Sequence, residues 1–314
     1  MVSLPFTFHT GRFSCIILPD NPDGKEFCTV KTVSILNHKG GVGKTTVTAC
    51  VSQALALTGF RVLAIDNDSQ HNLSAMLGAG VHTPSIRDVY RASTADAPAV
   101  LLKSIRKTDI PDLHIITSQG GLVDADIRDT ACLRGAMAAC GLERFYDYVL
   151  IDNAPGMGRL QEVSILASNE IFVPTELKQF AVDGIAEMEA MLKHRFGDAA
   201  RITRVIPNFY KDTKRQNSFL AALGTLFGGR VTATAIPADS VFDELVTEGK
   251  VLFLHRLYSK GAAYYLKLIH ELFDFDENAT WETMLEKRRL RMSEDARQRF
   301  IKRRRRETDD AHGS

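Results

Sequence analysis

Short apolar runs alternate with longer segments of helical spacing over most of the chain. Six apolar runs predict buried strands, at residues 30–36, 61–65, 148–151, 170–173, 204–206 and 232–236. Between them, apolar positions recur every three or four residues and predict helices at 45–57, 182–195 and 262–273. Apolar strands that alternate with helices are typical of a parallel sheet covered on both faces. We therefore predict an α/β fold, doubly wound, with a mainly parallel sheet and helices on both faces.

Four of these predicted strands end at a polar or turn-forming residue. Asn37, Asp66, Asp152 and Pro174 come directly after, or at the end of, an apolar run. In open parallel sheets the ligand binds beyond the carboxyl ends of the strands. The sequence therefore places the functional site at this edge.

The composition is close to that of an average globular protein. The chain has 314 residues, of which 45% are hydrophobic and 25% charged, and this excludes a disordered chain, a fibre and a membrane bundle. Five cysteines form no CxxC pair, which favours reduced thiols and a cytoplasmic location.

The formal net charge of +1 conceals an uneven distribution of charge. Residues 281–306 contain eleven Lys and Arg against four Asp and Glu. We therefore expect three parts: an extension at 1–28, a folded domain at 29–275 and a basic tail at 276–314. A basic tail can bind nucleic acid, or it can be a solvated terminus.

A phosphate-binding loop is predicted between the first strand and the first helix. Residues 37–46 read NHKGGVGKTT, a glycine-rich run that ends in the Gly-Lys-Thr typical of a phosphate loop and lies between a predicted strand and a predicted helix. Glycines let successive N–H groups point at phosphate oxygens, and the helix that follows adds its partial positive charge. Lys44 is expected to reach the β- and γ-phosphates of ATP, and Thr45 to bind Mg²⁺. The predicted ATP-binding residues are Lys39, Gly40, Gly41, Val42, Gly43, Lys44, Thr45 and Thr46.

A second lysine, Lys39, stands at the start of the loop. Because Lys44 already supplies the loop's cation, Lys39 is placed to reach a nucleotide bound by a second molecule, in the way an arginine finger does. The alternative is a solvated surface lysine.

Two carboxylates, Asp66 and Asp68, leave the second predicted strand one residue apart. This spacing suits the positioning of a metal-bound or attacking water. Taken alone, it also suits an acidic cap on the next helix.

The segment 39–46, KGGVGKTT, resembles the deviant phosphate loop of the ParA/MinD family of ATPases, in which two subunits sandwich ATP. Residues 66–74, 146–156 and 259–262 resemble further elements of the ParA branch. The resemblance implies that Asp68 orients the attacking water, that Asp66 supports the Mg²⁺ shell and that Asp152 holds a Mg²⁺-bound water. Ser69 stands where the family usually has proline, and Asn67 where it usually has an apolar residue.

The resemblance is weaker beyond Pro207. It implies that Asn208 contacts adenine, although an asparagine there also suits a plain turn. Lys211, Lys214 and Arg215 match one region that binds DNA in relatives. A second such region, at 236–241, lacks the expected arginines.

The resemblance implies a DNA-partitioning ATPase of a plasmid or chromosome, with slow intrinsic turnover. The implied partners are a second copy of the chain in the ATP state, a ParB-like centromere-binding protein and non-specific DNA, whereas a membrane is not expected. The alternative is an ATP-switched positioning or scaffold ATPase that acts on a non-DNA cargo or a membrane surface.

Overall fold

The computed structural model describes residues 30–178, 180–239, 241–242, 252–256, 259–273 and residue 286. Apart from Glu286, the predicted extension at 1–28 and basic tail at 276–314 lie outside these residues, and so the predicted domain limits stay a prediction. No helix in the described ranges is long and apolar enough to cross a membrane.

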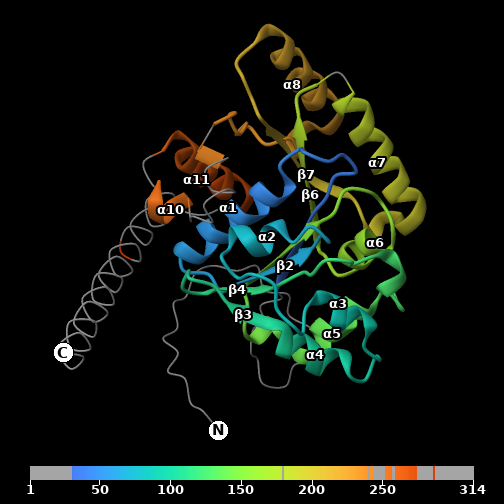
Figure 1. Cartoon of the computed structure of the whole chain (residues 1–314). Helices are drawn as coiled ribbons and strands as arrows, with labels where there is room; N and C mark the ends of the chain where they lie inside the picture. The colour runs from blue at the N-terminus through green and yellow to red at the C-terminus, as the bar shows by residue number, and fades with distance from the viewer. Residues whose placement is uncertain are drawn as a thin grey trace, which may run out of the picture.

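Seven strands form one sheet among the described residues (Figure 1). The strands are β1 (Lys31–Ile35), β2 (Val62–Asn67), β3 (Ile105–Lys107), β4 (Leu113–Ile116), β5 (Tyr148–Asn153), β6 (Glu170–Glu176) and β7 (Ile202–Asn208). Their order is β3-β4-β2-β5-β1-β6-β7, and every pair is parallel except β3 with β4. The predicted doubly wound, mainly parallel sheet is therefore confirmed. From β1 the chain first builds the β2 side of the sheet and later, with β6 and β7, the opposite side. Such a reversal of direction opens a ligand crevice beyond the carboxyl ends of the strands.

Helices cover both faces of the sheet (Figure 1). They are α1 (Lys44–Leu57), α2 (Asn72–Met76), α3 (Ile86–Arg91), α4 (Ala97–Ser104), α5 (Cys132–Cys140), α6 (Arg159–Leu166), α7 (Ala181–Phe196), α8 (Lys214–Phe227), α10 (Leu252–His255) and α11 (Lys260–Phe273). Side chains alternate across each strand, so neighbouring residues enter different cores. Val62 and Ala64 pack into the core that contains α1 and α11, whereas Leu63 and Ile65 pack into the core that contains α3, α4 and α5.

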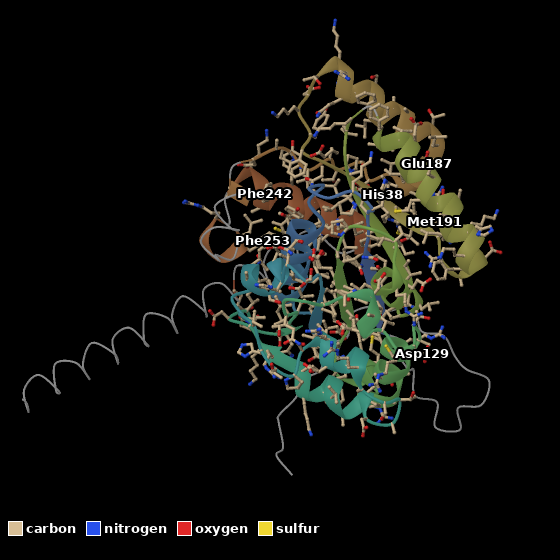
Figure 2. All side chains as sticks on the ribbon, turned by 45° about the vertical axis from the view of Figure 1, so that its right-hand side comes forward. His38, Asp129, Glu187, Met191, Phe242 and Phe253 are labelled. Carbon is tan, nitrogen blue, oxygen red and sulfur yellow. The ribbon has the colours of Figure 1, made fainter. Side chains whose placement is uncertain are left out.

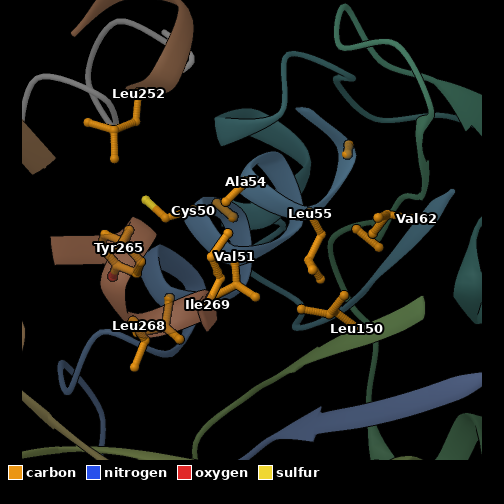
Figure 3. Close-up of a cluster of buried hydrophobic side chains, with 14 of the residues drawn as sticks. Cys50, Val51, Ala54, Leu55, Val62, Leu150, Leu252, Tyr265, Leu268 and Ile269 are labelled. Atoms are coloured by element: carbon orange, nitrogen blue, oxygen red, sulfur yellow. The ribbon is translucent and has the colours of Figure 1, made fainter. Parts of the chain in front are cut away.

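Helix α11 seals α1 from the solvent. Cys50 and Val51 of α1 belong to the same buried cluster as Tyr265, Leu268 and Ile269 of α11 (Figure 3). Ser259 caps this helix, because its hydroxyl accepts a hydrogen bond from the N–H of Ala262 at 3.1 Å. The phosphate loop thus continues into a helix that is buried on both sides.

Strands β6 and β7 continue past Pro174 and Pro207, where the sequence predicted their ends. Strand β1 pairs with β6 only as far as Phe172, so the missing N–H of Pro174 removes no bond between these two strands. Strand β7 lies at the edge of the sheet, where proline is tolerated.

The strand predicted at 232–236 is wrong. Only isolated bridges form, at Val231 and at Pro237, although the segment runs beside β7. The carboxylate of Glu271 on α11 accepts hydrogen bonds from the N–H groups of Ala233 and Thr234. These two donors are therefore unavailable for pairing with a strand.

Candidate functional site

The phosphate loop follows β1 and owes its shape to two glycines. Gly41 and Gly43 have φ angles of 72° and 89°, in the left-handed region that favours glycine. A Cβ atom on Gly43 would lie 2.2 Å from Nδ2 of Asn208. Position 43 therefore needs glycine for its backbone angle and for the close approach of β7. The curled backbone agrees with a cradle for phosphate oxygens.

Lys44 is the first residue of α1 and is buried. Its Nζ donates a hydrogen bond to the carbonyl oxygen of Lys39 at 3.0 Å, so the side chain folds back over the loop. Burial lowers the pKa of Lys44, while the charges of Asp152 and Asp68 raise it. The ammonium thus stands between the loop and two carboxylates, where it can bind a phosphate.

Lys39 lies at the mouth of the loop, against the start of α7. Its Nζ donates to the carbonyl oxygen of Phe180 at 2.6 Å. A Cβ on Gly184 would lie 3.1 Å from the His38 ring and 3.4 Å from Nζ of Lys39, so α7 approaches the loop closely there. His38 lies near Glu187 of α7 (Figure 2), and burial, followed by the charge of Lys39, lowers its pKa.

Asp152 and Asp66 are direct neighbours across the β2–β5 pair, and both are fully buried. Burial and then the neighbouring Asp66 raise the pKa of Asp152 to about 8, while Thr45 and Lys44 lower it. Oδ1 of Asp152 accepts a hydrogen bond from the Thr48 hydroxyl at 3.2 Å. Its Oδ2 is one of five buried side-chain polar atoms in the described ranges with no partner. An unpartnered buried carboxylate oxygen of this kind suits a bound cation or its water.

Asp66 already has protein partners. Its Oδ2 accepts bonds from the N–H and the hydroxyl of Ser74, at 2.8 and 2.7 Å, and its Oδ1 accepts from the N–H of Asp68. Burial raises its pKa to about 6 although these bonds lower it. Because Ser74 lies in the first turn of α2, Asp66 does contact the start of the next helix, as the alternative interpretation of an acidic cap expected. Its role in the metal shell stays a prediction.

Asp68 is buried and begins a tight turn at the end of β2. Its Oδ1 accepts a bond from the N–H of Gln70 at 3.0 Å, and its carbonyl accepts from the N–H of His71. This turn forms although Ser69 stands in place of the family's proline. Asp68 is also close enough to Lys44 and Asp152 to influence both of their pKa values.

The residues present fit Mg²⁺ bound together with a nucleotide. No three His, Cys, Asp or Glu side chains in the described ranges could hold a metal ion by themselves. Mg²⁺ usually takes one or two protein ligands and completes its shell with phosphates and waters. Thr45 and Asp152 would supply the protein part of such a shell. Oδ2 of Asp152, which has no hydrogen-bond partner among the described residues, could contact the ion or one of its waters.

The remaining predicted residues lie at the end of β7 and in the segment that follows it. Asn208 is buried, donates to the carbonyl of Val42 at 3.0 Å, and accepts from the N–H of Phe209. Its amide therefore braces the phosphate loop, and its contact with adenine stays a prediction. Lys211, Lys214 and Arg215 are exposed at the start of α8.

Three buried polar residues at the site were not predicted. Thr48 binds Asp152, and Asn67 hydrogen-bonds to Asn153 across the last rung of the β2–β5 pair. The sequence signal that could have identified them was a polar residue inside an otherwise apolar helix or at the end of a strand. That signal does not reveal the partner, which lies about a hundred residues away along the chain.

Comparison with known proteins gives one consistent result. A family model described as an AAA domain matches residues 30–197. The chromosome partitioning protein ParA of Caulobacter vibrioides is 32% identical over 256 residues, covering 77% of this chain and 94% of the relative. The sporulation initiation inhibitor protein Soj of Bacillus subtilis is 28% identical over 251 residues, covering 77% and 98%. Among solved structures, the septum site-determining protein MinD of Pyrococcus horikoshii, complexed with Mg-ADP, superposes with a TM-score of 0.64 at 27% identity, over 78% of this chain and 96% of that one.

Proposed function

The chain belongs to the ParA/MinD family of ATPases, and from that membership we propose that it partitions DNA between daughter cells. The proposed cycle has an ATP-bound dimer that holds DNA and subunits that separate after hydrolysis. Enzymes of this family bind and hydrolyse ATP with Mg²⁺, and relatives named for chromosome partitioning support the assignment to DNA.

In the proposed reaction, each residue of the site has a separate task. The N–H groups of the phosphate loop and Lys44 hold the β- and γ-phosphates. Mg²⁺, when bound, would neutralise charge on the phosphates, with Thr45 and Asp152 as its protein contacts. Asp68 orients the attacking water, and the Asx turn to Gln70 supports this role because it fixes one of its oxygens. The phosphoryl group is thus transferred by positioning and charge stabilisation.

Lys39 is proposed to act on the nucleotide of a second copy. It lies at the loop's mouth, partly exposed, and a backbone carbonyl holds its ammonium. Exchanging that carbonyl for a phosphate of the other subunit replaces a neutral acceptor by a negatively charged one, which strengthens the bond. Lys39→Ala should keep ATP binding and lose ATP-dependent dimerisation, measured by light scattering. A variant that dimerises like the wild type would exclude the trans role.

The exposed cluster of Lys211, Lys214 and Arg215 carries the DNA part of the proposal. None of the three forms an ion pair among the described residues, so their charges are available to phosphates. They follow β7, whose Asn208 contacts the phosphate loop. Contacts to phosphates alone give binding without sequence preference and with a steep salt dependence. A ParB-like partner that accelerates hydrolysis completes the proposal.

A mobility-shift titration with non-specific duplex DNA tests it, with and without ATP and at two salt concentrations. We expect an ATP-dependent shift at low salt that weakens strongly at high salt. Lys211→Ala/Lys214→Ala/Arg215→Ala should abolish the shift, whereas a matched triple variant of exposed Lys103, Lys107 and Lys193 should retain it. The absence of any ATP-dependent shift in the wild type would overturn the DNA assignment and point to another cargo.

A further inference from the structure

Asn67 and Asn153 form a side-chain hydrogen bond at the very end of the β2–β5 pair. Nδ2 of Asn67 donates to Oδ1 of Asn153 at 2.9 Å, and the two residues are partners in the last rung of the strand ladder. Both are fully buried. Among the described residues, the only backbone bond that joins the two strands beyond this rung runs from the N–H of Ala154 to the carbonyl of Asn67. The side-chain bond therefore joins the ends of β2 and β5 at the point where their regular backbone pairing stops.

The rest of each amide is fully used. Asn67 also donates to the carbonyl of Leu160 and accepts from the hydroxyl of Tyr90, both at 2.9 Å. Nδ2 of Asn153 donates to the hydroxyls of Ser34 and Ser164, at 2.9 and 3.0 Å, and lies near two strand carbonyls. A buried network with every member satisfied is rigid, because any displacement leaves a polar group without a partner.

This pair connects two loops that contribute different parts of the ATPase site. The first segment, residues 66–74, carries Asp66 and Asp68 on either side of Asn67. The second segment, residues 152–158, begins with Asp152 and continues from Asn153, and Gln161 braces it through Ala154 and Gly158. Because side chains alternate along a strand, the amides lie on the sheet face opposite the carboxylates. They can fix the spacing of the carboxylates without touching the nucleotide.

We propose that the Asn67–Asn153 hydrogen bond is a positioning link for ATP hydrolysis, which holds the water-orienting and the metal-holding loops at one fixed separation. Asn67 and Asn153 lie on the opposite face of the sheet from the carboxylates, so they act through Asp68 and Asp152. The link should therefore affect the chemical step and not the binding of ATP, since the phosphate loop and Lys44 belong to a different strand and helix. The inference rests on the ATP hydrolysis of the proposed function and is independent of DNA.

The test measures steady-state ATP turnover of the full chain with Mg²⁺ and without DNA, in the wild type, Asn67→Leu, Asn153→Leu and the double variant. Each single variant should lower kcat about tenfold and change KM less than twofold. The double variant should lose no more than one single variant, because the link breaks only once. Losses that multiply in the double variant, or an unchanged kcat in folded single variants, would overturn the link.

Two further variants separate positioning from folding. Ser164→Ala removes another buried hydrogen bond of Asn153 but leaves the link intact, so it should lower the unfolding midpoint and keep kcat. Asn67→Ser keeps a small polar group that cannot reach Asn153, and it should reproduce the kcat loss if Asn67→Leu does not fold. A kcat loss in Ser164→Ala equal to that of Asn67→Ser would contradict the proposal. A wild type without turnover would overturn the proposed function itself, which is a different outcome.

Discussion

The two faces of the sheet carry opposite kinds of buried polar site, one residue apart along the same strands. On the α1 face, Asp66 and Asp152 place two carboxylates side by side, and an oxygen of Asp152 has no partner. On the other face, the Asn67–Asn153 pair satisfies its hydrogen-bonding groups within the chain. The acidic face thus has a carboxylate oxygen left for a ligand, whereas the amide face is satisfied within the folded protein.

This difference shows how one strand end can serve both binding and stability. Buried like charges destabilise the fold and raise pKa values, and the proposed binding of a cation with the nucleotide would relieve that cost. Satisfied amides add rigidity at the same level of the sheet. Mutations on the acidic face should therefore change activity most, and those on the amide face should change stability as well.

The largest effect is expected from Lys44→Ala, which removes the ammonium group next to the buried carboxylates. ATP affinity should fall at least about 100-fold, because the phosphates lose a charge-assisted contact in a buried site. Equilibrium binding of a fluorescent ATP analogue measures it. Lys39→Ala, in the same loop, is the matched control and should bind normally. Equal losses in the two variants would remove the distinction between the two lysines.

Asp152→Asn should separate activity from stability. Turnover should fall roughly 100-fold, since the Mg²⁺ shell loses its carboxylate. The ligand-free protein should become more stable at pH 8, by roughly 2–4 °C in its unfolding midpoint, because a neutral amide avoids burying a charge. Calorimetry in the presence of a chelator measures this shift. A lower midpoint at pH 8 would mean that Asp152 stabilises the empty site.

The stability of the ligand-free protein should fall as the pH rises. The folded-state pKa values of Asp152 and Asp66 are raised to about 8 and about 6, above the usual 3.8. The folded protein therefore keeps protons that the unfolded chain releases, so this contribution is fully present below about pH 4 and is lost through about pH 8. The unfolding midpoint of the wild type, compared with that of Asp152→Asn, should decrease between pH 5 and pH 8.5. Added Mg-ATP should make this decrease smaller. A difference independent of pH would argue against the raised values.

The smallest effect is expected from Tyr90→Phe on the amide face. It removes the hydroxyl that donates to Asn67, and the cost should be about 1 kcal/mol in the free energy of unfolding. Turnover should stay within about twofold, because the Asn67–Asn153 bond persists. Denaturant titration and a turnover assay report the two values. A tenfold loss of turnover would show that Tyr90 also positions the segments 66–74 and 152–158.

Much of the fold followed from local patterns. The apolar runs at β1, β2 and β5 and the loop between β1 and α1 are strong signals, because buried parallel strands and glycine turns leave a clear composition. Strand β4 and helices α3 and α4 were not predicted, since their short amphipathic patterns are ambiguous. The edge strand β3 has only three residues.

For the candidate site, the sequence indicated which side chains gather at one edge of the sheet, but not their contacts. Lys44, Thr45, Asp68 and Asp152 do meet at one edge. The bond between Asn67 and Asn153 joins residues 86 positions apart, and it depends on the β2–β5 register, which no local pattern reveals. From the sequence, Asn67 was only a departure from the apolar residue usual at that position.

The carboxylate of Glu271 has a consequence for the behaviour of the protein at high concentration. Strand β7 would otherwise be followed by an eighth strand whose own outer edge could pair with another chain. By binding the N–H groups of Ala233 and Thr234, Glu271 keeps that segment from offering a regular row of donors. The opposite edge is the three-residue strand β3, too short to be a good template. Both edges of the described sheet are thus protected against aggregation by strand addition.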